Sequence, residues 1–306
     1  MHPTTKQSTR ILFAPFIALG TWLGENHPVT LVKLRYFARF KRFPNLKEPK
    51  DLNEKILYLK LFTDTTEWTR LADKYLVRDY VKERGCGQYL VDFYGVWYDS
   101  KDIDFESLPN SFIFKANNGC GKGSNLIVSD KNKIDADEVR KTVNGWLHEK
   151  HVGALAAEPQ YKNMRPCVIA EALLPIDEGQ KSLVDYKIWC FNGKAHFIMT
   201  CSSRDVSFTK LNLFDTEWNQ VSEYMSPSVD YPIEDTPLPK PNNLPQMIVI
   251  AEVLAKGFPC VRVDLYNVNG RIYFGEMTFT SLGGMMHYYT PEFLMKCGEM
   301  IDLNYK

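Results

Sequence analysis

A glycine-rich segment with two lysines is the first part of the sequence whose residue types suit a chemical role. It runs from Phe112 to Asn125 and carries Lys115, Lys122 and glycines at 119, 121 and 123. Glycines let backbone amides approach an anion closely, and lysine ammonium groups suit phosphate. The segment could therefore cradle nucleotide phosphates, although it fits neither the Walker pattern nor a dinucleotide fingerprint. A flexible turn between two strands is the alternative.

A predicted hairpin from Val261 to Phe279, turning at Asn269-Gly270, places two acids at comparable positions. Asp264 lies on its first strand and Glu276 on its second, and together they would supply the hard oxygen ligands that Mg²⁺ prefers. A two-residue turn would oppose Asp264 to Gly275 and send Glu276 to the other face. A three-residue turn would bring the carboxylates to one face. The alternative is a solvated sheet face with ordinary polar residues.

A second predicted hairpin, from Val184 to Cys201 around Asn192-Gly193, places Asp185 and Lys187 on one face. The carboxylate could hold ribose hydroxyls and the lysine could hold a phosphate. A cross-strand ion pair on an exposed face is the alternative, and it would contribute only about 0.2 to 1 kcal/mol.

The remaining pattern mixes helices with short strands and indicates an α+β protein of several lobes. A capping box at Asp51 to Glu54 predicts the start of a helix, and a second helix is expected from about Trp68 to Arg84. Further strands and helices are expected at Tyr89–Trp97, Phe112–Lys115, Asn125–Val128, Ala136–Lys150, Cys167–Leu174 and Leu244–Lys256.

Composition excludes several classes of protein. The 306 residues include 37 basic and 37 acidic side chains, so the chain has no charge surplus for nucleic acid. The seven cysteines are scattered and contain no C-x-x-C pair. This argues against a disulfide framework and a structural zinc site, and it favours a reducing cytoplasm.

The first fifty residues differ from the rest of the chain in charge, because they contain nine basic side chains and only two acidic ones. The apolar run from Ile11 to Gly24 is too short to span a bilayer and lacks a signal cleavage site. We expect residues 10–43 to form a basic amphipathic helix on the cytoplasmic face of the inner membrane. Packing of this arm against the rest of the protein is the alternative.

The order of the motifs resembles that of the ATP-grasp superfamily. Their amino-acid sequences resemble those of the TupA-like proteins of bacterial surface-polysaccharide gene clusters. The resemblance extends from about Leu52 to Pro291 and rests on these segments: Leu52–Ile56, Leu71–Tyr75, Phe112–Asn125, Ile169–Glu171, Asp185–Lys187, Cys190–Lys194, Arg262–Tyr266 and Glu276. It implies two α+β lobes that hold ATP between antiparallel sheets. The implied division is a basic arm (1–50), a helical lobe (51–110), a phosphate-loop subdomain (111–174) and a metal-site subdomain (175–306).

The resemblance also implies a role for each site residue. Lys74, Lys115, Gly121, Lys122, Gly123 and Ser124 would hold or cover the phosphates of ATP; Glu171 and Leu174 would meet adenine, and Asp185 the ribose. Lys187, Arg204, Lys210 and Arg262 would be catalytic, and Asp264, Glu276 and Thr278 would ligate Mg²⁺. Thr278 departs from the asparagine found in many relatives and is a weaker ligand.

The implied reaction is ATP-dependent activation of a carboxylate as an acyl phosphate, followed by amide formation with an amine or amino acid. The expected carboxylate is a uronic acid of a capsule or O-antigen precursor. A sugar-nucleotide glycosyltransferase and a non-catalytic nucleotide-binding protein are the alternatives.

Overall fold

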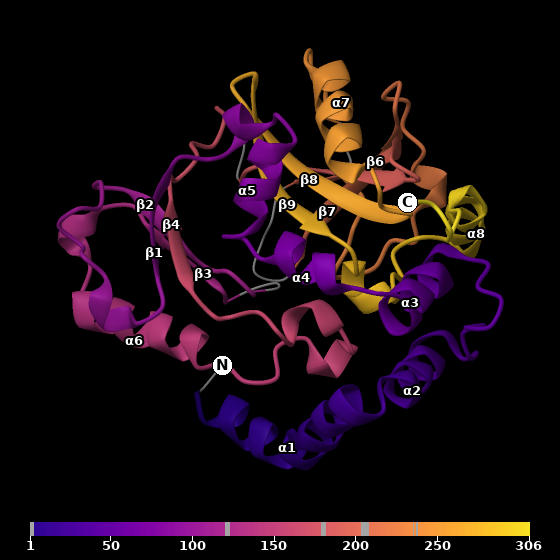
Figure 1. The fold of residues 1–306 in the computed structure, drawn as a ribbon, viewed down its shortest axis with the longest axis horizontal. Helices are drawn as coiled ribbons and strands as arrows, with labels where there is room; N and C mark the ends of the chain where they lie inside the picture. The colour runs from indigo at the N-terminus through magenta and orange to yellow at the C-terminus, as the bar shows by residue number, and fades with distance from the viewer. Residues whose placement is uncertain (1–2, 120–122, 179–181, 203–207, 235, 237) are drawn as a thin grey trace.

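Two antiparallel sheets form the framework of the protein (Figure 1). The computed structural model describes residues 3–119, 123–178, 182–202, 208–234, 236 and 238–306, with side chains from Ala14 onward. In Figure 1 the two sheets lie on either side of α4 (Thr66–Ala72) and α5 (Val77–Glu83). This confirms the α+β class and the ATP-grasp arrangement of two sheets.

The first sheet has four strands in the order β1-β4-β2-β3, all of them antiparallel. Alternate residues of β2 are buried because phenylalanine and alanine side chains face α6. The elements of this part are β1 (Phe93–Trp97), β2 (Phe112–Ala116), β3 (Asn125–Val128), β4 (Val168–Glu171) and α6 (Ala136–Leu147).

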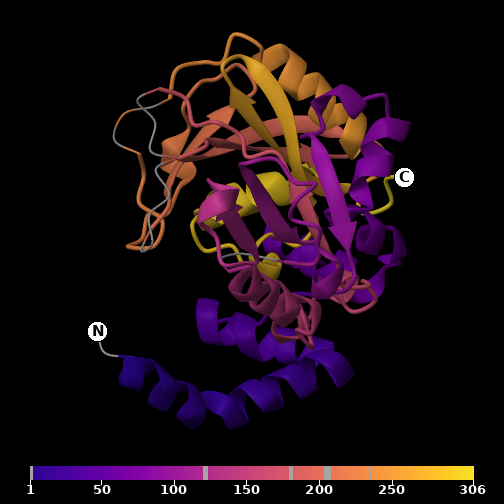
Figure 2. The same ribbon diagram turned by 90° about the vertical axis from the view of Figure 1, so that its left-hand side faces the viewer.

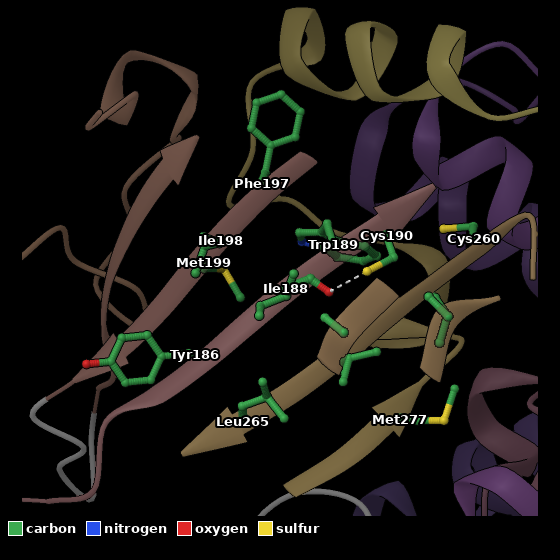
Figure 3. Close-up of a cluster of buried hydrophobic side chains, with 14 of the residues drawn as sticks. Tyr186, Ile188, Trp189, Cys190, Phe197, Ile198, Met199, Cys260, Leu265 and Met277 are labelled. Carbon is green, nitrogen blue, oxygen red and sulfur yellow. Dashed lines mark hydrogen bonds between the residues drawn. The ribbon is translucent and has the colours of Figure 1, made fainter. Parts of the chain in front are cut away.

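The second sheet has five strands in the order β7-β6-β5-β8-β9. Its apolar face belongs to the largest hydrophobic cluster, in which Ile188, Cys190 and Leu265 are buried (Figure 3). Helix α7 covers the sheet in Figure 1, since its residues contact β5, β6 and β8. The elements are β5 (Asp185–Phe191), β6 (Lys194–Ser202), β7 (Lys210–Asp215), β8 (Cys260–Val268), β9 (Arg271–Thr278) and α7 (Leu244–Ala255).

Helices from both ends of the chain complete this core. Helix α3 (Leu52–Phe62) packs against α8 (Pro291–Met300), and Asp51 caps α3 by accepting from the backbone of Glu54, as the sequence predicts. Short 3-10 helices occupy the connections at Gly87–Tyr89, Ser100–Asp102, Lys131–Lys133, Ala154–Ala156 (η4), Pro159–Tyr161 (η5), Ser222–Tyr224 and Ser281–Gly284 (η7).

Some boundaries predicted from the sequence are wrong. The helix expected over 68–84 is interrupted, and the strand expected from Tyr89 begins only at Phe93. Strand β1 comes from the segment assigned to a helical lobe, yet it pairs with β4 of the first sheet. Strand β7 and helix α8 were not anticipated. The four-part division of the chain stays a prediction.

The amino-terminal arm consists of α1 (Pro3–Asn26) and α2 (Pro28–Phe40), which lie beneath the rest of the protein in both views (Figures 1 and 2). Helix α2 buries Leu31, Val32 and Tyr36 against the body. The first part of α1 projects away from the body toward the N-terminus (Figure 2). None of the described helices is long and apolar enough to cross a membrane.

Candidate functional site

The break between α4 and α5 places Lys74 against the glycine-rich segment. Asp73 accepts hydrogen bonds from the backbone amides of Tyr75 and Leu76 at 2.8 and 3.1 Å. Such local side-chain bonds compete with helix formation and interrupt it. The ammonium of Lys74 donates to the carbonyl oxygen of Gly119. Asp73 therefore holds a lysine where it can contribute to a phosphate site.

Asn117 fixes the start of the same loop. Its side chain is fully buried, donates to Asp73 at 2.6 Å, and accepts from the backbone of Cys167 at 2.9 Å. Two residues later, a Cβ atom on Gly119 would lie 2.2 Å from the Cβ of Ser124, so only glycine allows this close approach. Gly123 has a φ of 102°, which glycine adopts freely.

The next pair of predicted residues, Lys115 and Glu171, come from neighbouring strands β2 and β4. The Lys115 ammonium lies 2.8 Å from the Glu171 carboxylate, which also contacts the Arg78 guanidinium at 2.6 Å. Arg78 in turn donates to the carbonyl oxygen of Val91 at 2.8 Å. Glu171 thus holds two cations beside the two central strands of the first sheet.

The second sheet gathers six predicted site residues on one face. Lys187 on β5 is opposite Asp264 on β8, which is opposite Glu276 on β9. Opposed residues of an antiparallel pair share a face, as do residues two apart along a strand. The shared face therefore carries Asp185, Lys187, Arg262, Asp264, Glu276 and Thr278.

A β-bulge produces this alignment of the two acids. The turn at Asn269-Gly270 has two residues, because Val268 pairs with Arg271, and both turn residues have positive φ. The sequence analysis linked a shared face to a three-residue turn, and this was wrong. Instead, Leu265 pairs with Phe274 and Asp264 with Glu276, leaving Gly275 as the extra residue. A Cβ atom on Gly275 would lie 2.9 Å from the Asp264 carbonyl oxygen.

Asp264 is the centre of the polar face. Its carboxylate accepts from Arg262 at 2.7 and 2.8 Å and also from Lys187, while Lys187 lies 3.1 Å from Asp185. Burial by itself would raise the pKa of Asp264, but the charges of Arg262 and Lys187 outweigh it and hold the pKa below its usual range. Burial would similarly lower the pKa of Lys187, but Asp264 raises it.

Glu276 differs from Asp264 because its side chain is 44% exposed. It lies 3.7 Å from Arg262 and accepts from the Thr278 hydroxyl at 3.2 Å. Two carboxylates from adjacent strands suit a Mg²⁺ ion whose other ligands are phosphate oxygens and water. The described residues contain no group of three or more acidic, histidine or cysteine side chains able to hold a metal.

A comparison with protein families decides the assignment. The model of the TupA-like ATPgrasp family matches residues 54–302, which is most of the chain. The chain belongs to the TupA-like ATP-grasp family. This confirms the resemblance seen in the motifs.

Solved structures similar to this TupA-like protein are distant. The D-alanine–D-alanine ligase of Bacillus anthracis, complexed with ATP, is 15% identical with a TM-score of 0.43, and the match covers 75% of this chain and 60% of that one. The N5-carboxyaminoimidazole synthetase of Staphylococcus aureus, complexed with ADP, is 14% identical with a TM-score of 0.42, covering 74% and 50%. The chain thus spans less than two thirds of either relative. No curated protein matches the sequence.

Some predicted site residues of this TupA-like protein do not join the polar face. Lys210 begins the edge strand β7, where it pairs with Glu234 at 2.7 Å, and the register places it on the face opposite to Lys187. Leu174 is half-buried in the connection after β4. Gly121, Lys122 and Arg204 lie outside the described residues.

Three residues of the site were missed by sequence reasoning. Arg78 contacts Glu171, Asn117 holds the glycine-rich loop, and Ser281 accepts from Arg262 at 2.7 Å. The Asn117-Asn118 pair was visible beside the glycines, but nothing in the sequence indicated that both side chains would be buried. Arg78 and Ser281 reach their partners only through the tertiary fold, so they left no local signal.

Proposed function

We propose that this protein is an ATP- and Mg²⁺-dependent ligase that activates a carboxylate as an acyl phosphate and joins it to an amine. The observation that carries the proposal is the bulged pairing of Asp264 and Glu276 beside Lys187 and Arg262. Two acids and two cations on one face suit a metal and the transferring phosphoryl group together. Family membership supports the same chemistry.

Residues of both sheets would bind ATP, each sheet holding a different part of it. On the first, Lys115 and Lys74 would bind the α- and β-phosphates, and Glu171 would meet adenine once ATP displaces one of its cations. On the second, Asp185 would hold the ribose. The loop of Gly121 to Ser124 would cover the phosphates, and Leu174 would offer its backbone to adenine.

Asp264 and Glu276 would hold Mg²⁺, with Thr278 as a weaker third ligand. The metal would neutralise charge on the phosphate oxygens when bound. Lys187 and Arg262 would face the γ-phosphate or the acyl phosphate, and we assign Arg204 to the same task. Lys210 is not assigned to it, because it lies on the opposite face of the sheet. Because Lys187 and Arg262 are buried with their acids, their charges act in a poorly screened environment, which strengthens them.

For the substrate, we propose a uronic acid carboxylate in a capsule or O-antigen precursor and an amine or amino acid as the second partner. This rests on the wording of the motifs and on the family they share with surface-polysaccharide proteins. Screening amino acids with purified uronic acid oligosaccharides for ATP-dependent phosphate release tests it. Release that needs no uronic acid would contradict it.

Calorimetry separates the ligase from the alternatives. Mg-ATP should bind with heat that Lys115→Ala reduces, whereas Mg-UDP should give no signal. Tight binding of UDP alone would favour a glycosyltransferase and end the ligase proposal. Nucleotide binding without phosphate release from any carboxylate and amine tested would favour a non-catalytic nucleotide-binding protein.

We also propose that the arm attaches this cytoplasmic enzyme to the anionic inner surface of a membrane. Phe16 is 72% exposed, and Ile17, Leu19 and Trp22 on the same helix are also exposed. A helix that is apolar on all sides is normally buried. Nearby exposed basic residues on or just after α2 would meet lipid phosphates, each contributing about 1 kcal/mol: Lys33, Arg35, Arg39 and Lys41.

One of the basic residues expected at the membrane has other partners. Arg42, the fifth basic residue expected at the membrane, is instead paired with Asp51 and Glu54 at 2.5 and 2.7 Å, and α2 packs on the body. We therefore assign lipid insertion to α1. Phe16→Ser with Trp22→Ser should abolish sedimentation with anionic vesicles at low salt, whereas Phe62→Ser on α3, also exposed, should not. Equal sedimentation of both variants would contradict the attachment.

A further inference from the structure

A cavity of about 420 Å³ lies between the arm and the body, outside the residues discussed so far as the site. Gly24 and Glu25 of α1 form one wall, Lys60 at the end of α3 forms another, and Glu158 and Tyr161 close it. This volume falls within the range of small-molecule pockets. The cavity is too small for an oligosaccharide chain and large enough for one compact molecule.

Two walls of the cavity continue into the candidate active site. Asn118 lines the cavity and directly precedes Gly119, whose carbonyl accepts from Lys74. On the other side, Glu158 accepts from the Thr280 hydroxyl at 2.5 Å. Thr280 is followed by Ser281, which accepts from Arg262. The cavity is therefore connected through Asn118 to the glycine-rich segment, and through Glu158, Thr280 and Ser281 to Arg262.

The inner end of the cavity carries an ammonium group with one N–H to spare. Lys60 is only 3% exposed, and its Nζ donates to the carbonyl oxygens of Ala156 and Gly283 at 2.6 and 2.7 Å. An ammonium has three donors, and the described contacts of Lys60 account for two. Because Lys60 also lines the cavity, its third donor is the group we assign to an anion bound there.

Glu158 supplies the opposite charge. Burial raises the pKa of its carboxyl group, although the Thr280 hydrogen bond and the charge of Lys60 oppose the rise. In the same way, burial lowers the pKa of Lys60 to about 8, opposed by Glu158. A carboxylate with a raised pKa is better suited to take a proton from an ammonium group.

We propose that this cavity binds the amine partner of the ligase as an α-amino acid, with Lys60 on its carboxylate and Glu158 on its amino group. The inference rests on the proposed function and gives that reaction a second substrate site. Glu158 takes one proton from the ammonium, which frees the nitrogen lone pair. The C–N bond then forms as the C–O bond to phosphate breaks, and the departing phosphate takes the second proton from nitrogen. Glu158 returns its proton to water.

Binding of free amino acids, measured by calorimetry on the full chain with and without Mg-ADP, tests the inference. A preferred amino acid should bind at least tenfold more tightly than its carboxamide in the wild type. Lys60→Met should abolish this preference, since it removes the group that recognises the carboxylate. Glu158→Gln can still accept from Thr280, and it should lower kcat and shift the pH profile while leaving the KM for ATP unchanged.

Glu149→Gln is the matched control, because Glu149 lies on the exposed rim of the same cavity and should alter neither quantity. If Lys60→Met fails to fold, the Glu158→Gln pH profile and a cavity-filling Val152→Trp, which should abolish amino-acid binding, still decide the matter. Binding of no amino acid, displacement of the amino acid by free glucuronate, or an unchanged preference in Lys60→Met would overturn the inference. Failure of Mg-ATP to bind would overturn the ligase proposal instead, because amino-acid binding is measured without ATP as well.

Discussion

Replacing Asp264 with asparagine should destabilise the fold as well as stop the reaction. From the sequence alone, Asp264→Asn and Glu276→Gln are both expected to abolish turnover and leave the fold intact. The structure distinguishes them, because Asp264 is 1% exposed and accepts from two buried cations. Removing one partner of a buried pair costs about 3 to 5 kcal/mol.

Lys187 and Arg262 each keep another partner when Asp264 is replaced, so the loss of stability should be at the lower end of that range. After the substitution, Lys187 keeps Asp185 at 3.1 Å, and Arg262 keeps the Ser281 hydroxyl at 2.7 Å. We therefore expect Asp264→Asn to lower the free energy of unfolding by about 3 kcal/mol. Glu276→Gln, whose side chain is 44% exposed and 3.7 Å from Arg262, should cost at most about 1 kcal/mol.

Urea unfolding at pH 7 measures the loss of unfolding free energy in each variant. Equal m-values for the variants and the wild type check that the folded and unfolded states expose the same surface. Because the folded-state pKa of Asp264 is lowered, its contribution is complete above the unfolded value of about 3.9. It is lost as the pH falls through the lower folded-state value. The gap between wild type and Asp264→Asn should therefore be constant from pH 5 to 8 and narrow in acid. A loss below about 1 kcal/mol, equal to that of Glu276→Gln, would refute the reasoning.

Three further predictions follow from the same contacts. Gly275→Val should destabilise the protein by about 1 to 3 kcal/mol and weaken Mg²⁺-dependent ATP binding, because its Cβ would meet the backbone of β8; unchanged calorimetry would show that the bulge tolerates a side chain. Lys115→Ala should weaken ATP binding at least tenfold, while Lys133→Ala, 81% exposed on the same lobe, should not, and equal losses would argue against a phosphate role. Burial lowers the pKa of Lys60 from 10.5 to about 8, so the unfolding free energy of the wild type should rise between these pH values as the buried cation loses its proton. Lys60→Met should lack this rise in urea titrations at pH 7 and 10.

The sequence predicted those helices and strands that are determined by neighbouring residues. Short apolar runs predicted β2 and β3, and the acidic cap at Asp51 predicted the start of α3. The interruption at Asp73 was missed although the bonds that make it, from the amides of Tyr75 and Leu76, are local. Helix-forming residues surround Asp73, and Asn117, which also holds its carboxylate, lies far along the chain. The edge strand β7 was missed although Leu211 and Leu213 alternate with polar residues, because the run is short and its pairing with β6 is decided by the sheet.

The candidate site shows the same division. Strand periodicity placed Asp185 with Lys187 and Arg262 with Asp264, but it left the face of Glu276 to depend on the turn. Only the family resemblance grouped Lys187, Asp264 and Glu276 in one site. The predicted reason for the position of Glu276, a three-residue turn, was wrong. A β-bulge brings Glu276 to the face of Asp264 instead, and a bulge depends on the pairing along both strands and not on the turn. The cavity beside Lys60 was invisible, since α1, α3 and the segment around Glu158 meet only in the folded protein.

The extra residue at Gly275 has a consequence for how related chains are compared. Because it is unpaired, a chain lacking it could keep the same two-residue turn and oppose the same two acids in a regular ladder. The number of residues between the two metal-binding carboxylates is therefore not fixed by their task. A search for relatives that requires constant spacing would discard such chains, whereas one that allows a single-residue gap before the second acid would retain them. A Gly275 deletion that still binds Mg-ATP would show that the two spacings are interchangeable.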